Sequence, residues 1–266
     1  MLASRLAYYL TSIPTLLLGV RNWPTMAAVS LGVPVRRPLV VRARPRPLAF
    51  HVRSAMDVWT VKETCLDHFY DLGRLRAGDV RVVVDLGAGF GDFAIYAASR
   101  YPRSTVYAYE PSPESFVMLQ ENVRLNRAGR VHAFPYAVVG RAAGPLTLYT
   151  GTRAKVQHTL VGAGKLAAGR AVEVETVALA DVFREHGIDR CDLLKIDCEG
   201  AEYDIILQSD AATIGRISHI AMEYHDGVTA YSHRDLAAFL RRQGFQISLR
   251  RNQAHAELGY LYAWRP

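Results

Sequence analysis

The chain has 266 residues, of which 50% are hydrophobic and 21% are charged, and this composition excludes a wholly disordered or fibrous protein. Its net charge of +7 suggests an anionic partner, but the charge is unevenly distributed along the chain. Residues 1–56 contain eight arginines and no acidic residue, whereas the rest contains 24 of the 32 basic residues and all 25 acidic ones. The sequence therefore predicts a basic N-terminal leader over 1–56 and a nearly neutral domain over 57–266.

The leader begins with an apolar stretch from Leu6 to Val20, which is too short to cross a bilayer. Three interpretations stay open: a helical cap on the domain, a helix on a membrane surface, or a signal peptide. From Pro38 to Arg53, apolar and basic residues alternate around prolines, which favours a short β-hairpin over a solvated linker. The three cysteines lack metal-ligand spacing and indicate reduced thiols in a cytoplasmic protein, with membrane association through the leader left open.

After Asp79, β-rich runs alternate with longer helical stretches, a pattern typical of a mostly parallel sheet with helices on both faces. Only seven residues, 251–257, separate the last two runs, and a parallel crossover needs more. The last strand is therefore expected to run antiparallel. The predicted strands cover 80–85, 105–110, 131–135, 172–177, 192–197, 217–224, 245–250 and 258–264, and the predicted helices cover 92–99, 113–126, 179–186, 201–208 and 232–243.

A glycine-rich loop, DLGAGFGD, joins the first of these strands to the first of these helices. Gly87, Gly89 and Gly91 permit a tight turn that leaves the backbone open to a ligand, and the amides that begin the helix favour an anionic group. The glycine spacing differs from the nicotinamide fingerprint G-x-G-x-x-G and suits S-adenosylmethionine. Asp85, which ends the strand, is expected to meet the ammonium of this cofactor directly or through water.

A second acidic residue, Glu110, ends the next strand 25 residues after Asp85 and is followed by Pro111 and Ser112. A carboxylate at such a position can accept hydrogen bonds from both hydroxyls of a ribose. An isolated glutamate there would more simply be an exposed strand end. Two acids that end adjacent strands, with a glycine turn between them, favour a nucleoside site to which Glu110 and Pro111 both belong.

Two further strands end in acidic segments, DCEG at 197–200 and EYH at 223–225. Because open α/β sheets bind ligands at the carboxyl ends of their strands, Asp197, Glu199, Glu223 and His225 are expected to converge beside the sulfonium. Such a group offers two chemistries. His225 or a carboxylate could deprotonate a hydroxyl, or Asp197, Glu199 and Glu223 could bind Mg²⁺. The structural alternative is that Asp197 and Glu199 cap the helix that follows.

Other polar residues receive weaker assignments. Lys195 lies in an apolar strand, where a solvated edge or a salt bridge is favoured over catalysis. The glycine-rich insertion 151–170, which contains His158 and Thr159, is expected to face the substrate. Three residues before the first sheet strand could fold over the cofactor as a lid: Asp57, Glu63 and Tyr70.

From about Asp57 to its end, the chain resembles the FkbM family of S-adenosylmethionine-dependent methyltransferases. The resemblance is carried by VVVDLGAGFGDFA, VYAYEPSPESFVMLQENVRLN, FPYAVVG, DLLKIDCEGAEYDIIL and MEYH. It implies the class I methyltransferase fold, a Rossmann-like αβα sandwich whose seven-stranded, mostly parallel sheet ends in an antiparallel strand. The family's cofactor contacts correspond to Asp85, Gly87, Glu110 and, more loosely, Ala137. Gly89 departs from the family, in which relatives often carry Asn.

The leading hypothesis is an O-methyltransferase that uses S-adenosylmethionine, with Mg²⁺ as an optional second cofactor. Its acceptor would be a hydroxyl on a sugar, a glycolipid or a natural product. The alternative is a non-catalytic, methyltransferase-like binding or scaffolding protein that docks on a membrane or an acidic polymer. Nucleic-acid methylation is disfavoured, because the positive charge lies outside the catalytic domain and no base-flipping motif is visible.

Overall fold

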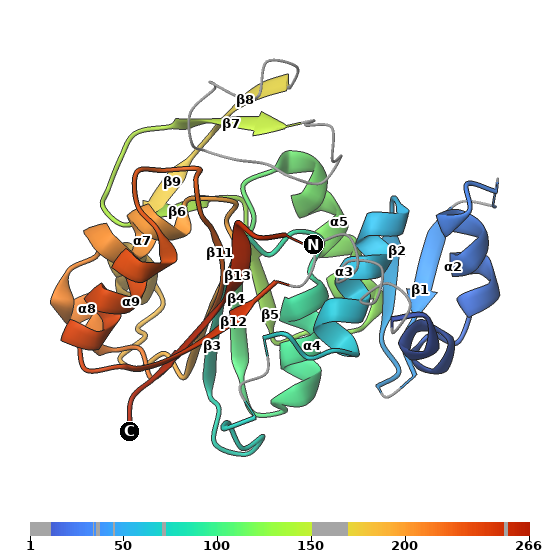
Figure 1. Cartoon of the computed structure of the whole chain (residues 1–266), viewed down its shortest axis with the longest axis horizontal. Coiled ribbons are helices and arrows are strands. Elements are labelled where there is room, and N and C mark those ends of the chain that lie inside the picture. The colour runs from blue at the N-terminus through green and yellow to red at the C-terminus, as the bar shows by residue number, and fades with distance from the viewer. Residues whose placement is uncertain are drawn as a thin grey trace.

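The structure is a computed structural model that describes residues 12–33, 35, 38–44, 46–70, 73–150, 170–252 and 255–266. It consists of a three-layered αβα domain and a smaller N-terminal lobe at one end of the molecule (Figure 1). Within the described ranges, no helix is long and apolar enough to cross a membrane.

A seven-stranded sheet forms the middle layer, in the order β12-β13-β11-β10-β3-β4-β5. The strand β13 is antiparallel to both of its neighbours, β11 and β12, and the remaining pairs are parallel. This topology confirms the predicted class I methyltransferase fold and the direction of its last strand. The strands are β3 (Val82–Leu86), β4 (Thr105–Tyr109), β5 (Val131–Phe134), β10 (Leu193–Ile196), β11 (His219–His225), β12 (Gln246–Arg251) and β13 (Leu258–Trp264).

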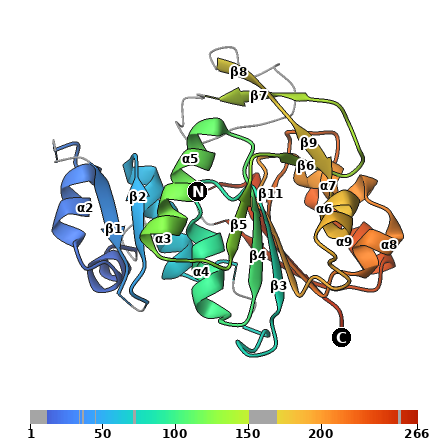
Figure 2. The ribbon, with the colours of Figure 1, turned by 180° about the vertical axis from the view of Figure 1, so that it is seen from behind.

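The prediction of a sheet strand at 172–177 is wrong. This segment is divided between β8 (Arg170–Val174), which pairs with β7 (Leu146–Thr150), and β9 (Thr176–Ala178), which pairs with β6 (Ala137–Val139). Both pairs lie outside the central sheet, and β7 and β8 form an arm above it (Figure 2). The apolar residues of the run are explained by a small cluster of their own around Leu148 and Val174. Residues 151–169 of the predicted substrate-facing insertion, including His158 and Thr159, lie outside the described residues.

Helices cover both faces of the sheet (Figures 1 and 2). Local sequence explains where several of them begin. At α5, the Ser112 side chain accepts a hydrogen bond from the backbone N–H of Ser115, and at α9 Ser232 and Asp235 form a capping box. The helices α3 and α8 are additions to the predicted set. One face carries α3 (Ala55–Cys65), α4 (Asp92–Arg100) and α5 (Pro113–Leu125), and the other carries α6 (Leu179–Glu185), α7 (Glu202–Gln208), α8 (Ala211–Gly215) and α9 (His233–Arg242).

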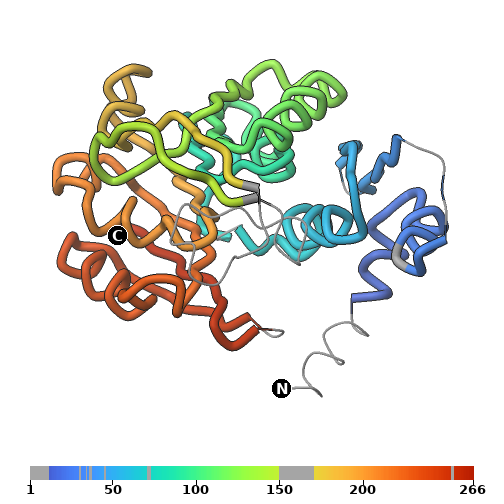
Figure 3. The backbone as a smooth tube through the Cα atoms, turned by 90° about the horizontal axis from the view of Figure 1, so that it is seen from above, coloured from blue at the N-terminus to red at the C-terminus, as the bar shows by residue number. Residues whose placement is uncertain are grey.

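The N-terminal lobe contains a helix over 12–19, α2 (Trp23–Ser30) and an antiparallel hairpin of β1 (Leu39–Arg42) and β2 (Ala49–Val52). The predicted hairpin is therefore confirmed. It is fastened to α5, because the backbone N–H of His51 donates to Oδ1 of Asn122 at 2.7 Å and that of Ala49 to Oδ1 of Asn126 at 2.9 Å. Phe50 is fully buried in the core that the lobe shares with one face of the sheet. Seen from above, the helices of the lobe project beyond the domain (Figure 3).

Candidate active site

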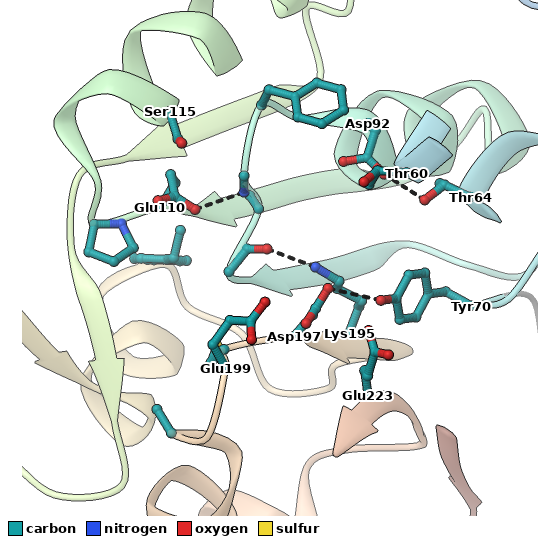
Figure 4. Close-up of a pocket in the computed structure, with 18 of the residues that line it drawn as sticks. Thr60, Thr64, Tyr70, Asp92, Glu110, Ser115, Lys195, Asp197, Glu199 and Glu223 are labelled. Carbon is teal, nitrogen blue, oxygen red and sulfur yellow. Dashed lines mark hydrogen bonds between the residues drawn. The ribbon is translucent and has the colours of Figure 1, made fainter. Parts of the chain in front are cut away.

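A cavity of about 240 Å³ opens at the carboxyl ends of β3, β4, β10 and β11 (Figure 4). Parallel strands bring these ends to one edge of the sheet, as the sequence interpretation required. Three of the predicted site residues do not line the cavity: Asp85, Gly91 and His225. The predicted residues that do line it are Gly87, Gly89, Glu110, Pro111, Ala137, Asp197, Glu199 and Glu223.

The glycine turn lies between the cavity and the loop after β10. Gly87 has a φ of +71°, and a Cβ there would lie 1.9 Å from the carbonyl oxygen of Asp197, so only glycine fits. Gly89 has a φ of +55°, and among the described residues no atom beyond its chain neighbours lies within 4 Å of the position of a Cβ. The turn therefore packs tightly on its inner side and presents bare backbone to the cavity on its outer side.

Glu110 binds the same turn from the neighbouring strand. Its Oε2 accepts the backbone N–H of Gly89 at 2.8 Å, and its Oε1 accepts that of Ser112 at 2.8 Å. Burial raises the pKa of this carboxyl to about 7, although the two N–H donors oppose the shift. Each carboxylate oxygen can accept a further hydrogen bond, so Glu110 can receive two hydroxyl donors from the cavity.

Asp85 lies beneath the turn and forms an ion pair with Lys195. The distance from Oδ1 of Asp85 to Nζ of Lys195 is 3.1 Å, and Nζ also donates to the carbonyl oxygen of Gly87 at 2.8 Å. Burial disfavours the charge on Lys195, but the carboxylates of Asp85, Asp197 and Asp92 outweigh this effect and raise its pKa. The salt bridge predicted for Lys195 is confirmed, and its place in the middle of the sheet excludes a solvated edge. Because Asp85 is fully buried, this geometry does not show the predicted direct contact with a cofactor ammonium.

Tyr70 fixes the carboxylate of Asp197 at the cavity wall (Figure 4). Its hydroxyl donates to Oδ2 of Asp197 at 2.9 Å, and its ring packs edge-on against Phe93 and Tyr260 at centroid distances of 5.5 and 6.0 Å. Burial, followed by the negative charge of Asp197, raises the pKa of Tyr70 well above its ordinary value. Tyr70 is therefore a neutral donor throughout the physiological pH range.

The three residues predicted for a lid have different positions. Glu63 and Tyr70 line the cavity, whereas Asp57 is buried away from it and accepts the backbone N–H of Arg53 at 2.6 Å. The helix α3, to which Asp57 and Glu63 belong, is held against α4 because Oγ1 of Thr64 donates to Oδ2 of Asp92 at 2.5 Å. The segment before β3 is therefore a packed wall of the cavity.

His225 is held between two carboxylates behind the wall. Its Nδ1 lies 3.1 Å from Oε1 of Glu202, and its Nε2 lies 3.2 Å from Oε2 of Glu199. Burial favours the neutral ring, but Glu202 and Glu199 outweigh this effect and raise the pKa of His225 well above its ordinary value. An imidazolium already carries the proton that a general base must accept, so the hypothesis that His225 is the base is not supported by these contacts.

The same contacts bear on the predicted magnesium site. Among the described residues, the ligand atoms that approach within 4.8 Å of one another belong to Asp197, Glu223 and His225, while Glu199 contacts His225. Mg²⁺ prefers an octahedral set of oxygen ligands. Glu199 contacts His225 and is not grouped with the other two carboxylates, and Asp197 is already hydrogen-bonded by Tyr70, so Asp197, Glu199 and Glu223 do not present such a set in this arrangement.

Glu223 is the carboxyl group with the fewest constraints in the cavity. Its side chain makes no hydrogen bond or ion pair with any other described residue, and it points toward Asp197 (Figure 4). Burial, followed by the negative charge of Asp197, raises its pKa well above the ordinary value for glutamate. An unpaired carboxyl with a raised pKa, beside a ligand cavity, is typical of groups that transfer protons.

The sequence interpretation missed the role of two residues at the site. For Lys195 a salt bridge was predicted, but not that its partner is Asp85 or that it supports the glycine turn. Glu202 was assigned to a helix only, although its two oxygens bind the backbone N–H groups of Gly200 and His225 at 2.8 Å each. Its position three residues after Glu199, at the start of a helix, was the available signal.

Comparison with known proteins gives one family. Residues 85–247 match the methyltransferase FkbM domain. The chain is 33% identical over 201 residues to the 31-O-demethyl-FK506 methyltransferase FkbM of Streptomyces tacrolimicus, a match that covers 65% of this chain and 75% of that protein. It is 23% identical over 213 residues to the hexuronic acid methyltransferase AglP of Haloferax volcanii, covering 79% and 82% respectively. A match of 28% identity to the antimetabolite synthetase AmbE of Pseudomonas aeruginosa covers 73% of this chain but 11% of that protein.

Proposed function

The chain belongs to the FkbM family of methyltransferases, and on this premise we propose that it transfers the methyl group of S-adenosylmethionine to a hydroxyl oxygen of a small-molecule acceptor. The acceptor classes that we favour are sugars, glycolipids and natural products. The names of the relatives from Streptomyces tacrolimicus and Haloferax volcanii, which specify 31-O-demethyl-FK506 and hexuronic acid, support such acceptors.

The residues around the glycine turn fit this cofactor. Glu110 would accept the two ribose hydroxyls on the lone pairs that Gly89 and Ser112 leave free. Pro111 and Ala137 line the adjoining part of the cavity, where a base would pack beside the ribose. The missing side chain of Gly89 leaves room against the backbone for the methionine portion. Asp85 would not touch the cofactor. It would support the glycine turn from beneath, because it pairs with Lys195, whose ammonium donates to the carbonyl oxygen of Gly87.

The cofactor supplies a methyl group that is already activated by its bond to a positively charged sulfur. The protein therefore has two tasks, which are to align the acceptor oxygen with that methyl group and to remove the acceptor proton. Asp197 and Glu223 are the carboxyl groups in position for the second task. We assign the role of proton acceptor to Glu223, because Asp197 is already hydrogen-bonded by Tyr70.

His225 has a structural role in this proposal. As a cation between Glu199 and Glu202, it fixes the loop after β10 against the end of β11, the two elements that carry Asp197 and Glu223. Glu199 has a φ of +50°, a conformation that non-glycine residues seldom adopt, and its contact with His225 holds the side chain in place. His225 thereby sets the relative positions of the two carboxyl groups.

The observation that supports the proposal most strongly is the contact between Glu110 and the N–H of Gly89 at the edge of the cavity. Titration calorimetry with S-adenosylmethionine tests it. Glu110→Ala is expected to weaken binding at least about a hundredfold, since two charge-assisted hydrogen bonds are lost. Glu121→Ala, on the exposed surface of α5, is the matched control and should bind normally. A wild-type protein that binds no S-adenosylmethionine would instead fit the non-catalytic binding or scaffolding alternative.

A further inference from the structure

We propose that the N-terminal lobe docks on an anionic lipid bilayer. The docking surface, called here the lobe face, consists of the outward sides of helix 12–19 and α2 together with Arg21, Arg42 and Arg44. The lobe lies at one end of the molecule, and its helices project beyond the αβα domain (Figures 1 and 3).

The helix over 12–19 is apolar on its solvent side. Four exposed residues, Ile13, Pro14, Leu17 and Leu18, fall within an arc of about 140° when each residue advances about 100°. Leu18 is 74% exposed and Ile13 is 50% exposed. The polar Ser12 points the other way and is buried. A surface helix of a soluble domain normally shows the reverse arrangement, with its polar residues outward.

The second helix also exposes apolar residues. Trp23, Pro24 and Ala27 are exposed, as is the polar Thr25 on another side of the helix, and Leu31 continues the line of the three apolar residues one residue beyond the end of α2. The four apolar positions fall within about 100° of arc, and Leu31 is 81% exposed. Met26 of α2 is buried.

Exposed apolar residues are concentrated in the lobe. The described residues contain thirteen large hydrophobic side chains that are exposed, and six of them lie between residues 13 and 33. The other seven are distributed from residue 56 to residue 249. Scattered apolar side chains are ordinary on protein surfaces, whereas a concentration of them marks an interaction site.

Three exposed arginines gather beside the apolar helices. The backbone N–H of Arg21 donates to the carbonyl oxygen of Arg42 at 2.8 Å, and that of Arg44 donates to Gly19 at 2.7 Å. These bonds tie the end of β1 to the junction between helix 12–19 and α2. No acidic residue occurs anywhere in 1–56, so the lobe itself offers no carboxylate to pair with the arginines.

The positive charge of the lobe face favours a lipid surface over a second copy of the chain as its partner. Two copies that met through the lobe face with two-fold symmetry would bring like-charged arginine clusters together without any acid from the lobe to neutralise them. Anionic headgroups neutralise such a cluster, and the acyl boundary accepts Trp, Leu and Ile side chains to a depth of about 5–10 Å. Exposed apolar helices flanked by arginines therefore match the chemistry of an anionic bilayer.

Co-sedimentation of the full chain with lipid vesicles tests the proposal. The protein is expected to sediment with vesicles of phosphatidylcholine and phosphatidylglycerol, and far less with phosphatidylcholine alone. Arg21→Gln, Arg42→Gln and Arg44→Gln in one variant should lower the partition coefficient about a hundredfold, because each arginine near an anionic surface is worth about a fivefold change. Leu18→Gln with Leu31→Gln should lower it about tenfold or more.

Matched controls separate the lobe face from general effects of charge and polarity. Replacement of Arg234, Arg241 and Arg242 by Gln on the exposed side of α9 removes the same net charge, and Leu249→Gln removes an exposed leucine of β12. Both controls should sediment like the wild type.

The proposal is overturned if the wild type does not bind anionic vesicles, or if the α9 variant loses as much vesicle binding as the lobe variant. It is also overturned if the wild type forms a dimer in ultracentrifugation that Leu18→Gln with Leu31→Gln dissociates, while the wild type does not bind vesicles. None of these outcomes depends on methyl transfer, so the proposed function is tested separately.

Discussion

The ammonium of Lys195 lies 3.1 Å from the carboxylate of Asp85, and both side chains are almost completely excluded from solvent. Neither oxygen of Asp85 has a well-aligned hydrogen-bond donor among the described residues, so the ion pair is the main compensation for its burial. The pair lies on adjacent central strands, β3 and β10, directly below the glycine turn. The ion pair therefore stabilises the sheet and also supports the conformation of the cofactor loop.

Lys195→Met keeps most of the side-chain volume but leaves Asp85 buried without a counter-ion. We expect the free energy of unfolding to fall by about 3–5 kcal/mol, measured by urea denaturation. The double variant Asp85→Asn with Lys195→Met should recover part of this loss, because it removes the unpaired charge. A loss below about 1 kcal/mol in the single variant would mean that the ion pair contributes little.

The raised pKa of Glu110 predicts how cofactor affinity depends on pH. Only the carboxylate can accept both ribose hydroxyls, so affinity should be constant above a pH of about 7 and should fall about tenfold per pH unit below it. Glu110→Gln cannot ionise and should bind weakly with a flat profile. Calorimetric titrations between pH 5.5 and 8.5, about one unit and a half either side of that pKa, measure both profiles. A sloping profile in Glu110→Gln would assign the titration to another group.

Tyr70→Phe removes the hydroxyl that orients Asp197 and leaves the ring packed on Phe93 and Tyr260. The loss of a hydrogen bond to a charged acceptor is expected to lower kcat/KM about tenfold to a hundredfold, with cofactor affinity nearly unchanged. Tyr203→Phe is a matched control, since the Tyr203 hydroxyl donates to Asp226 at 2.7 Å outside the cavity. Equal effects of the two variants on kcat/KM would indicate that Tyr70 serves stability alone.

Glu223→Gln tests the assignment of the proton acceptor. Because its pKa is raised, the wild-type Glu223 is ionised only at higher pH, so activity should fall as the pH is lowered through that pKa. The variant should lose about 10²–10⁴-fold in kcat and should also lose this limb of the pH profile. If Asp197→Asn removes the limb while Glu223→Gln retains it, Asp197 is the base instead.

The strand ends of the site could be predicted from sequence because each is marked locally. Asp85, Glu110, Asp197 and Glu223 each follow or end a short apolar run, and alternation with helices places those ends on one edge of a parallel sheet. The antiparallel last strand was likewise determined by one short connection. These features depend on spacing along the chain, which a sequence displays directly.

The partners of these residues could not be predicted, because they come from distant parts of the chain. Lys195 reaches Asp85 and Gly87 only after strands more than a hundred residues apart are paired. The protonation of His225 depends on Glu202. The helical pattern of the sequence does not show that the Glu202 side chain reaches β11. Segment 172–177 has the same apolar pattern as a sheet strand, and only its pairing with β7 and β6 shows that it belongs to the arm and its base.

The central claim is that Glu110 binds the ribose hydroxyls of the cofactor, and a double-mutant cycle on protein and ligand measures this contact directly. S-adenosylhomocysteine and its 2′,3′-dideoxyribose analogue would be titrated into the wild type and into Glu110→Ala. We predict that loss of the two hydroxyls weakens binding to the wild type about a hundredfold and hardly changes binding to the variant. The same weakening in both proteins would show that the hydroxyls are bound elsewhere and would contradict the assignment.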